Sequence, residues 1–300
     1  MDGAGGEPVV TDGVTGLSWR GCAAGQTGDQ CAGDATLMSW HDAVSLCEDS
    51  TWGGHDDWTL PDSHQLHSIV DFSRTSPALD PDVFANAPSK FQQEYDQWWI
   101  ECVWSSTDYA GDSSVAWVMM SNSGDISEGS GTEYHLNTKD AATWEGCYVY
   151  CVRGGAPPAE YERYVVREPV EGEPVVADTA TRLMWQGCSA GQTGAGCTPD
   201  AEFMDWMSGL AYCEGLTWAG LDDWRLPNIR ELRSIADVTR ERPAIDAAAF
   251  PNTPYYGPIM DNNAGQYWSS TARSYNSFAL YVGFNSGFSH FYEMPEGRHV

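Results

Sequence analysis

The chain contains one stretch of sequence twice. Residues 7–61 return as residues 173–227, so that "EPVVTDGVTGLSWRGCAAGQTGDQC" is followed later by "EPVVADTATRLMWQGCSAGQTGAGC". A period this long is the length of a complete globular domain and is too long for a solenoid repeat. The repeat therefore predicts two domains of one fold. A residue present in both copies is expected to serve that shared fold.

We predict a first domain at residues 1–156, a linker at 157–172 and a second domain at 173–300 that lacks its closing strand. The linker is rich in Pro, Glu and Gly, which is typical of a connecting segment. Each domain is long enough to bury an ordinary hydrophobic core.

The surface of the chain is strongly acidic. It has 43 acidic residues against 15 basic ones, for a net charge of -28. Such a surface repels phosphate backbones and anionic membranes, which argues against nucleic-acid binding. No apolar run reaches the roughly 20 residues that a membrane span needs, so we expect no membrane insertion. No signal peptide is present in this numbering, and an exported protein would have lost its leader.

Two local disulfides follow from the repeat. Cys22 and Cys31 enclose a short Gly-containing loop, and Cys188 and Cys197 enclose the same loop in the second copy. This spacing favours a local disulfide over a metal site, and no Cys-x-x-Cys pair occurs in the chain. Disulfides form in oxidising compartments, so we predict a secreted or cell-surface protein.

The remaining cysteines are assigned by comparing the two copies. Cys47 matches Cys213, and Cys151 has no counterpart because the alignment places it beyond Val300. We therefore predict a Cys47–Cys151 disulfide and an unpaired or intermolecular Cys213. Cys102 and Cys147 are both absent from the second copy, as expected of a bonded pair.

Local patterns predict the main elements of each copy. Val10 and Trp19 lie in an opening strand pair, and apolar residues at helical spacing predict a helix over residues 37–48. A second helix is expected to begin at Asp62, and at Asn228 in the second copy, because each has a Gln or Glu three residues later. Antiparallel hairpins follow, so the fold class is predicted to be α+β.

The motifs also resemble a known family. "DDWRLPN", "PAID", "YWSST" and "CVRGG" are together similar to the C-terminal domain family of the Legionella collagen-like adhesin. The resemblance implies two tandem C-type-lectin-like domains, each with two helices and short antiparallel strands, stapled by disulfides. It also implies an extracellular adhesion module. The sulfated polysaccharides proposed as ligands in that family would need a basic face, which this sequence lacks.

The sequence offers two candidate chemical sites. Asp56 and Asp57, with Asp222 and Asp223 in the second copy, are candidate calcium ligands. The alternative is that one aspartate caps a turn and the other pairs with an arginine. Formylglycine-generating relatives of the fold hold copper with a cysteine pair, but no nucleophile or general base accompanies the cysteines here. We therefore expect no enzyme and no cofactor, with calcium as the open possibility.

The copies differ most in their late loops, where aromatic and amide side chains gather. Such side chains suit contacts with sugars or proteins. The predicted ligand-binding residues are Trp98, Trp99, Tyr109, Trp144, Tyr255, Tyr256, Asp261, Asn262, Asn263 and Tyr275. The predicted function is a non-catalytic adhesion module for an extracellular glycan or protein. The alternative is a structural subunit of a surface filament or sheath that self-associates through strand or disulfide exchange.

Overall fold

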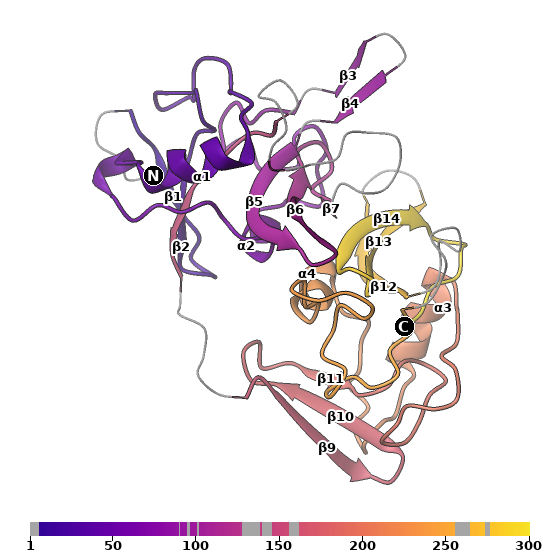
Figure 1. The fold of residues 1–300 in the computed structure, drawn as a ribbon. Helices are drawn as coiled ribbons and strands as arrows, with labels where there is room; N and C mark the ends of the chain where they lie inside the picture. The colour runs from indigo at the N-terminus through magenta and orange to yellow at the C-terminus, as the bar shows by residue number, and fades with distance from the viewer. Residues whose placement is uncertain are drawn as a thin grey trace. The chain divides into compact units, whose positions relative to one another are not determined.

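The computed structural model divides the chain into two compact units, Met1–Pro157 (unit one) and Pro158–Val300 (unit two) (Figure 1). It describes residues 6–89, 91–94, 97–100, 102–127, 139, 146–155, 162–255, 265–273 and 277–300. For residues 91–94 and 97–100 it describes the backbone alone.

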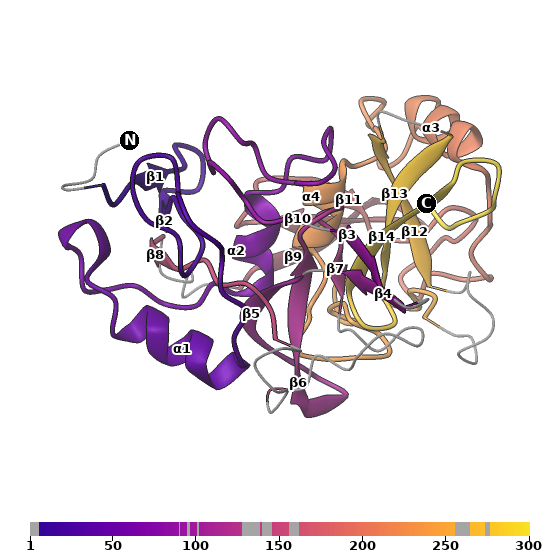
Figure 2. The same cartoon turned by 90° about the horizontal axis from the view of Figure 1, so that it is seen from above.

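Unit one begins and ends in the same small sheet. Its strands lie in the order β1-β2-β8 and are all antiparallel, with bounds Val9–Thr11, Leu17–Arg20 and Val152–Gly154 (Figure 2). Trp19 on the central strand lies opposite Val10 on one side and Val152 on the other. The closing strand therefore covers an edge of β2 that the opening hairpin leaves unpaired.

The helices of unit one are short, and the two α-helices begin at side-chain caps. They are α1 (Trp40–Glu48), the 3-10 helix η1 (Trp52–Gly54) and α2 (Ser63–Ser68). Asp62 forms the predicted capping box with Gln65, which satisfies backbone N–H groups that the first turn would otherwise leave unpaired. A helix of six residues is marginal in isolation, so its stability depends on packing of buried residues such as Leu66.

The rest of unit one consists of two further antiparallel ladders. One joins β5 (Cys102–Tyr109), β6 (Asp112–Met120) and β7 (Ile126–Ser127) in that order. The other is the hairpin of β3 (Phe91–Glu94) and β4 (Gln97–Ile100). Trp104 and Trp117 of the three-stranded sheet are fully buried and belong to the core of the unit.

Unit two repeats the two α-helices and the late sheet of this plan. Helices α3 (Trp206–Glu214) and α4 (Ile229–Ser234) correspond to α1 and α2, and the late sheet has the order β12-β13-β14, with bounds Gln266–Ala272, Phe278–Gly283 and Phe288–Glu293. Its opening sheet has the order β11-β10-β9, with bounds Met184–Gln186, Glu173–Asp178 and Tyr164–Val170. In unit one the third strand pairs with the second strand of the hairpin. In unit two it pairs with the first.

Tryptophans shared by the two copies tie loops to the backbone. Trp52 Nε1 donates to Pro8 O at 2.8 Å, and Trp218 Nε1 donates to Pro174 O at 2.8 Å. Trp104 Nε1 likewise donates to Met38 O at 2.8 Å. A buried indole carries a single donor, and a partner for it fixes the ring in one orientation. The shared tryptophans thus serve the common fold, as the repeat predicted.

The structure joins four cysteine pairs, which are the pairs that the comparison of the copies gave. They are Cys22–Cys31, Cys47–Cys151, Cys102–Cys147 and Cys188–Cys197. Cys213 is free and buried. The longest bridge, between residues 47 and 151, links α1 to the segment that leads into β8.

The predicted fold class, an α+β C-type-lectin-like domain, is wrong. The described strands fall into four separate three-stranded sheets and one two-stranded hairpin, and isolated bridges such as Val103 to Tyr148 connect the closing segment to β5. The motifs that suggested the fold specify caps, indole contacts and turns. All of these are local, and none of them specifies which strands share a sheet.

Candidate functional site

Val300, the last described residue of unit two, takes the position that Val149 occupies in unit one. Met204 bridges to Arg298 as Met38 does to Cys147, and the backbone N–H of Ala190 donates to Val300 O as that of Ala24 does to Val149 O. Residues 150–155 of unit one, called here the closing segment, therefore have no counterpart among the described residues of unit two.

An apolar groove occupies the corresponding place in unit two. Its volume is about 430 Å³, which is within the usual range for ligand pockets. One wall is β11, with Met184 and Trp185, and Cys213 of α3 also lines it. The inner surface is formed by buried apolar side chains, namely Leu226, Leu232, Ile235, Ile245, Phe250 and Phe284. We call this the unit-two groove.

Side chains that are covered in unit one are partly uncovered here. Trp19 is completely buried beneath β8, whereas its counterpart Trp185 is half-buried. Ser18 is buried and pairs with Arg153, whereas its counterpart Met184 is 45% exposed. An exposed apolar side chain beside an apolar hollow is typical of a binding surface.

The thiol of Cys213 lies in this groove in an unreactive form. Burial, together with the nearby charge of Glu214, raises its pKa to about 12. Only the thiolate is a nucleophile, so the thiol reacts slowly near neutral pH. Its counterpart Cys47 is bonded to Cys151 of the closing segment.

Charged side chains form the rim of the groove. Arg225 donates to both carboxylate oxygens of Glu231 at 2.7 and 2.6 Å, and these bonds lower the pKa of Glu231 despite its partial burial. Asp223 also lines the rim and is exposed. Its counterpart Asp57 accepts a hydrogen bond from Arg153 Nε at 2.5 Å, and that bond lowers the pKa of Asp57.

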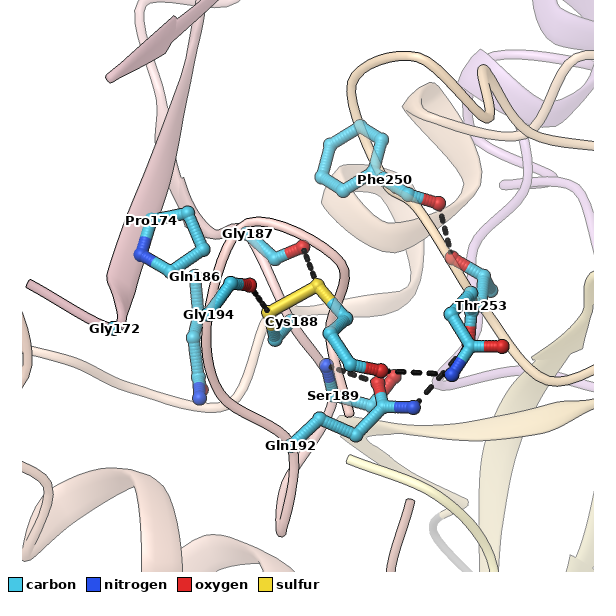
Figure 3. The surroundings of a disulfide bond; sticks show 12 residues. Gly172, Pro174, Gln186, Gly187, Cys188, Ser189, Gln192, Gly194, Phe250 and Thr253 are labelled. Atoms are coloured by element: carbon cyan, nitrogen blue, oxygen red, sulfur yellow. Dashed lines mark hydrogen bonds between the residues drawn. A yellow bond between two sulfur atoms is a disulfide. The ribbon is translucent and has the colours of Figure 1, made fainter. Parts of the chain in front are cut away.

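The Cys188–Cys197 disulfide braces one end of the groove (Figure 3). Asn252 Nδ2 donates to Cys197 O at 2.7 Å, and Gln192 Nε2 donates to Asn252 O at 3.3 Å. Figure 3 shows Gln186, Phe250 and Thr253, which line the groove, around this loop. The groove thus borders a loop that is closed by a disulfide.

Most of the predicted ligand-binding side chains lie outside the part of the chain that the structure describes. Trp98 and Trp99 lie on β4, for which only the backbone is described. Tyr109 ends β5 and is half-buried, with its ring edge-to-face with Trp117 at 6.1 Å, and Tyr255 is half-buried in unit two. The others lie outside the described residues, namely Trp144, Tyr256, Asp261, Asn262, Asn263 and Tyr275. The aromatic-loop site stays a prediction.

The four aspartates proposed for calcium are all exposed. In unit one Asp57 pairs with Arg153, which is the alternative that the sequence left open. Over the part of the chain that the structure describes, no group of three or more His, Cys, Asp or Glu side chains converges as a metal site. Calcium binding at the four residues, namely Asp56, Asp57, Asp222 and Asp223, stays a prediction.

The sequence did not single out the lining of the groove. The repeat nevertheless contains a signal for it, because Trp19 and Phe84, which contact the closing segment in unit one, have aromatic counterparts in the second copy. Trp185 and Phe250 correspond to Trp19 and Phe84, and Phe84 packs edge-to-face on Tyr150 at 5.7 Å. Mapping those contacts onto unit two would have located the groove.

A protein-family model matches both copies of the repeat. The model of the Lcl C-terminal domain matches residues 8–153 and again residues 174–300. The chain belongs to this family. A comparison with curated proteins finds no match.

Membership of the Lcl C-terminal domain family suggests an adhesin-like module, and such domains are not enzymes. Together with the four disulfides it also suggests an extracellular location. Within the described ranges, the longest helices, α1 and α3, have 9 residues, and no helix has the length and apolarity to cross a membrane.

Proposed function

We propose that this chain is an extracellular, non-catalytic adhesion module and that its ligand is a protein. The unit-two groove is the observation that supports this proposal. It is apolar inside and charged at its rim, as are the contact surfaces of proteins that bind other proteins. A polyanionic glycan is a poorer ligand because the chain carries a net charge of -28.

The absence of catalysis is supported by the state of the free thiol. Catalytic cysteines have a lowered pKa, whereas burial raises that of Cys213 to about 12. His299 cannot act as a base toward solvent either, because it is buried and its Nδ1 lies 3.1 Å from Glu202 O.

Adhesion assays with two matched variants test the proposal. Met184 is 45% exposed and lines the groove, whereas Met207 is 64% exposed on α3 and does not line it. Met184→Glu is expected to weaken binding to immobilised extracellular proteins about tenfold by placing a charge at an apolar contact. Met207→Glu is expected to leave binding unchanged. The glycan ligand would be favoured instead if binding occurred only on glycan arrays.

The aromatic loops supply a second contact surface in this proposal. Tyr109 and Tyr255 are partly exposed, and rings with a polar tip are frequent at protein interfaces. Tyr109→Ala and Tyr255→Ala, tested in the same assay, measure the contribution of each loop. If both variants bind as well as the parent chain, the loops take no part in adhesion.

A further inference from the structure

The strand β9 forms the outer edge of the opening sheet of unit two. It pairs with β10 on one side, at the end of the order β11-β10-β9 (Figure 1). The backbone N–H of Thr179 donates to Arg163 O at 2.9 Å, so Arg163 and, two residues further on, Val165 bond to β10. In an antiparallel ladder such residues alternate with residues that bond on the other side. The backbone groups of Tyr164 and Val166 therefore point away from β10.

This outer edge is unpaired in the part of the chain that the structure describes. There the backbone N–H and C=O groups of Tyr164 and Val166 make no hydrogen bond. The side chain of Val166 is 49% exposed, and Val170 at the end of the strand is 41% exposed. Unpaired backbone groups beside exposed β-branched side chains are a template for a further strand.

We propose that a second copy of this chain occupies the edge, so that two β9 strands lie antiparallel across a two-fold axis at Val166. In a two-fold interface each copy contributes the same surface. The N–H of each Val166 donates to the C=O of the other, and the two exposed valine side chains meet. This inference goes beyond the proposed adhesion function and does not rest on it.

The charges of the strand select this register. With Val166 on the axis, Arg167 lies opposite Val165 of the second copy, and Glu168 lies opposite Tyr164. With Val165 on the axis, Arg163 would lie opposite Arg167, and with Arg167 on the axis this residue would face its own copy. Like charges directly opposite each other destabilise a strand pair. The register centred on Val166 avoids both conflicts.

Two features limit the strength of this pairing. Pro169 has no backbone N–H to donate, so the shared ladder ends beside it. Each copy also carries a net charge of -28, so two copies repel each other. Salt screens this repulsion, and self-association is therefore expected to strengthen as salt is added. A basic partner on the same edge would show the opposite dependence on salt.

Cysteine cross-linking tests the register. Val166 meets its own copy, whereas the similarly exposed Val170 lies opposite Glu162 of the second copy. Residues that face each other in a bonded antiparallel pair have Cα atoms about 5.5 Å apart, which a disulfide can span. With oxidised glutathione as the oxidant, Val166→Cys is expected to form a disulfide-linked dimer at least about tenfold faster than Val170→Cys. Peptide mapping identifies the bridge, and Cys213 is buried in the folded chain.

Sedimentation equilibrium measures the association without a cross-link. The parent chain is expected to self-associate as its concentration rises toward about 1 mM, with a dissociation constant that falls several-fold between about 50 and 500 mM salt. Val166→Pro removes the outward N–H and leaves the bonds to β10, so it is expected to weaken association at least about tenfold. Val166→Thr keeps the N–H and the β-branched shape and is expected to associate within about twofold of the parent chain.

Three results would each overturn the proposal. They are a parent chain that stays monomeric at every concentration and salt, equal cross-linking of the two cysteine variants, and unchanged association of Val166→Pro. The cysteine pair decides the question even where Val166→Pro melts at a lower temperature. Association that weakens with salt would point to another interface and would also overturn it. If self-association fails while Met184→Glu still weakens adhesion, the proposed function stands and the strand pairing alone is lost.

Discussion

The two equivalent cysteines, Cys47 and Cys213, allow the stabilising effect of one cross-link to be measured against a built-in control. The Cys47–Cys151 bridge closes a loop with a sequence separation of 104 residues. The loss of loop-closure entropy for that length corresponds to about 4.7 kcal/mol of stability at 25 °C. Replacing both cysteines by alanine is expected to destabilise unit one by this amount.

The control is Cys213→Ala in unit two. That thiol is buried but bonded to nothing, so its removal costs only the contacts of one sulfur, about 1 kcal/mol. For a unit of this size a loss of 1 kcal/mol lowers the melting temperature by roughly 3 °C. The double variant is thus expected to melt about 15 °C lower, and Cys213→Ala about 3 °C lower.

Differential scanning calorimetry of the whole chain under oxidising conditions checks both values. The expected stabilisation comes from the cross-link and not from the packing of the sulfur atoms. Equal shifts for the two variants would refute it, because both remove a buried cysteine from the same position of the fold. A shift of only a few degrees for the double variant would show that the loop model does not apply to this bridge.

Three further predictions concern single residues. Burial lowers the pKa of His299 to about 4 from an ordinary 6.5. Because the unfolded chain takes up the proton first, the free energy of unfolding of unit two is expected to fall by up to about 3 kcal/mol as the pH falls through this range. His299→Tyr, which copies Tyr148 of unit one, should remove that pH dependence in urea titrations. Asn252 has φ of 51° and donates to Cys197 O, so Asn252→Ala is expected to cost about 2 kcal/mol and Asn252→Gly about 1 kcal/mol less, measured by thermal unfolding. Asp57 is engaged by Arg153, so adding calcium is expected to leave the melting temperature of the parent chain and of Asp57→Asn unchanged, and a calcium-dependent rise in the parent alone would contradict this.

The sequence predicted the parts of the fold that depend on local signals. The capping boxes at Asp62 and Asn228 occur as expected because cap and partner are three residues apart. The pairing of Cys47 with Cys151 was also accessible, because the repeat shows which cysteines appear and disappear together. The signal for the caps lies within a few residues of each helix start, and the signal for the cysteine pairing lies in the comparison of the two copies.

The sheets could not be predicted in the same way. The edge of β2 is completed by Val152, more than a hundred residues away, and no local pattern specifies that partner. The motifs therefore suggested the wrong fold class, although they suggested the right family. The groove was missed for the same reason, because it is defined by the strand that fills its place in unit one.

The junction that ends each unit is held by different means. In unit one Cys147 is bonded to Cys102, whereas in unit two Arg298 takes that position and is almost completely buried. Its guanidinium lies 5.1 Å from the Trp268 ring, 5.0 Å from Tyr281 and 4.3 Å from Tyr292. The rings accept a cation that has no carboxylate partner among the described residues.

The replacement of a bonded cysteine by Arg298 lies next to the groove, because Val300, two residues further on, lines it. A disulfide holds the end of unit one with a covalent bond, whereas ring contacts can separate and re-form without breaking one. Unit two has thus replaced the bridge beside the groove and left Cys213 within it unbonded. Over the described residues, the segment around Arg298 is thus held by packing and by its bridges to β12 and to Met204, whereas the equivalent segment of unit one is held in addition by the Cys102–Cys147 disulfide.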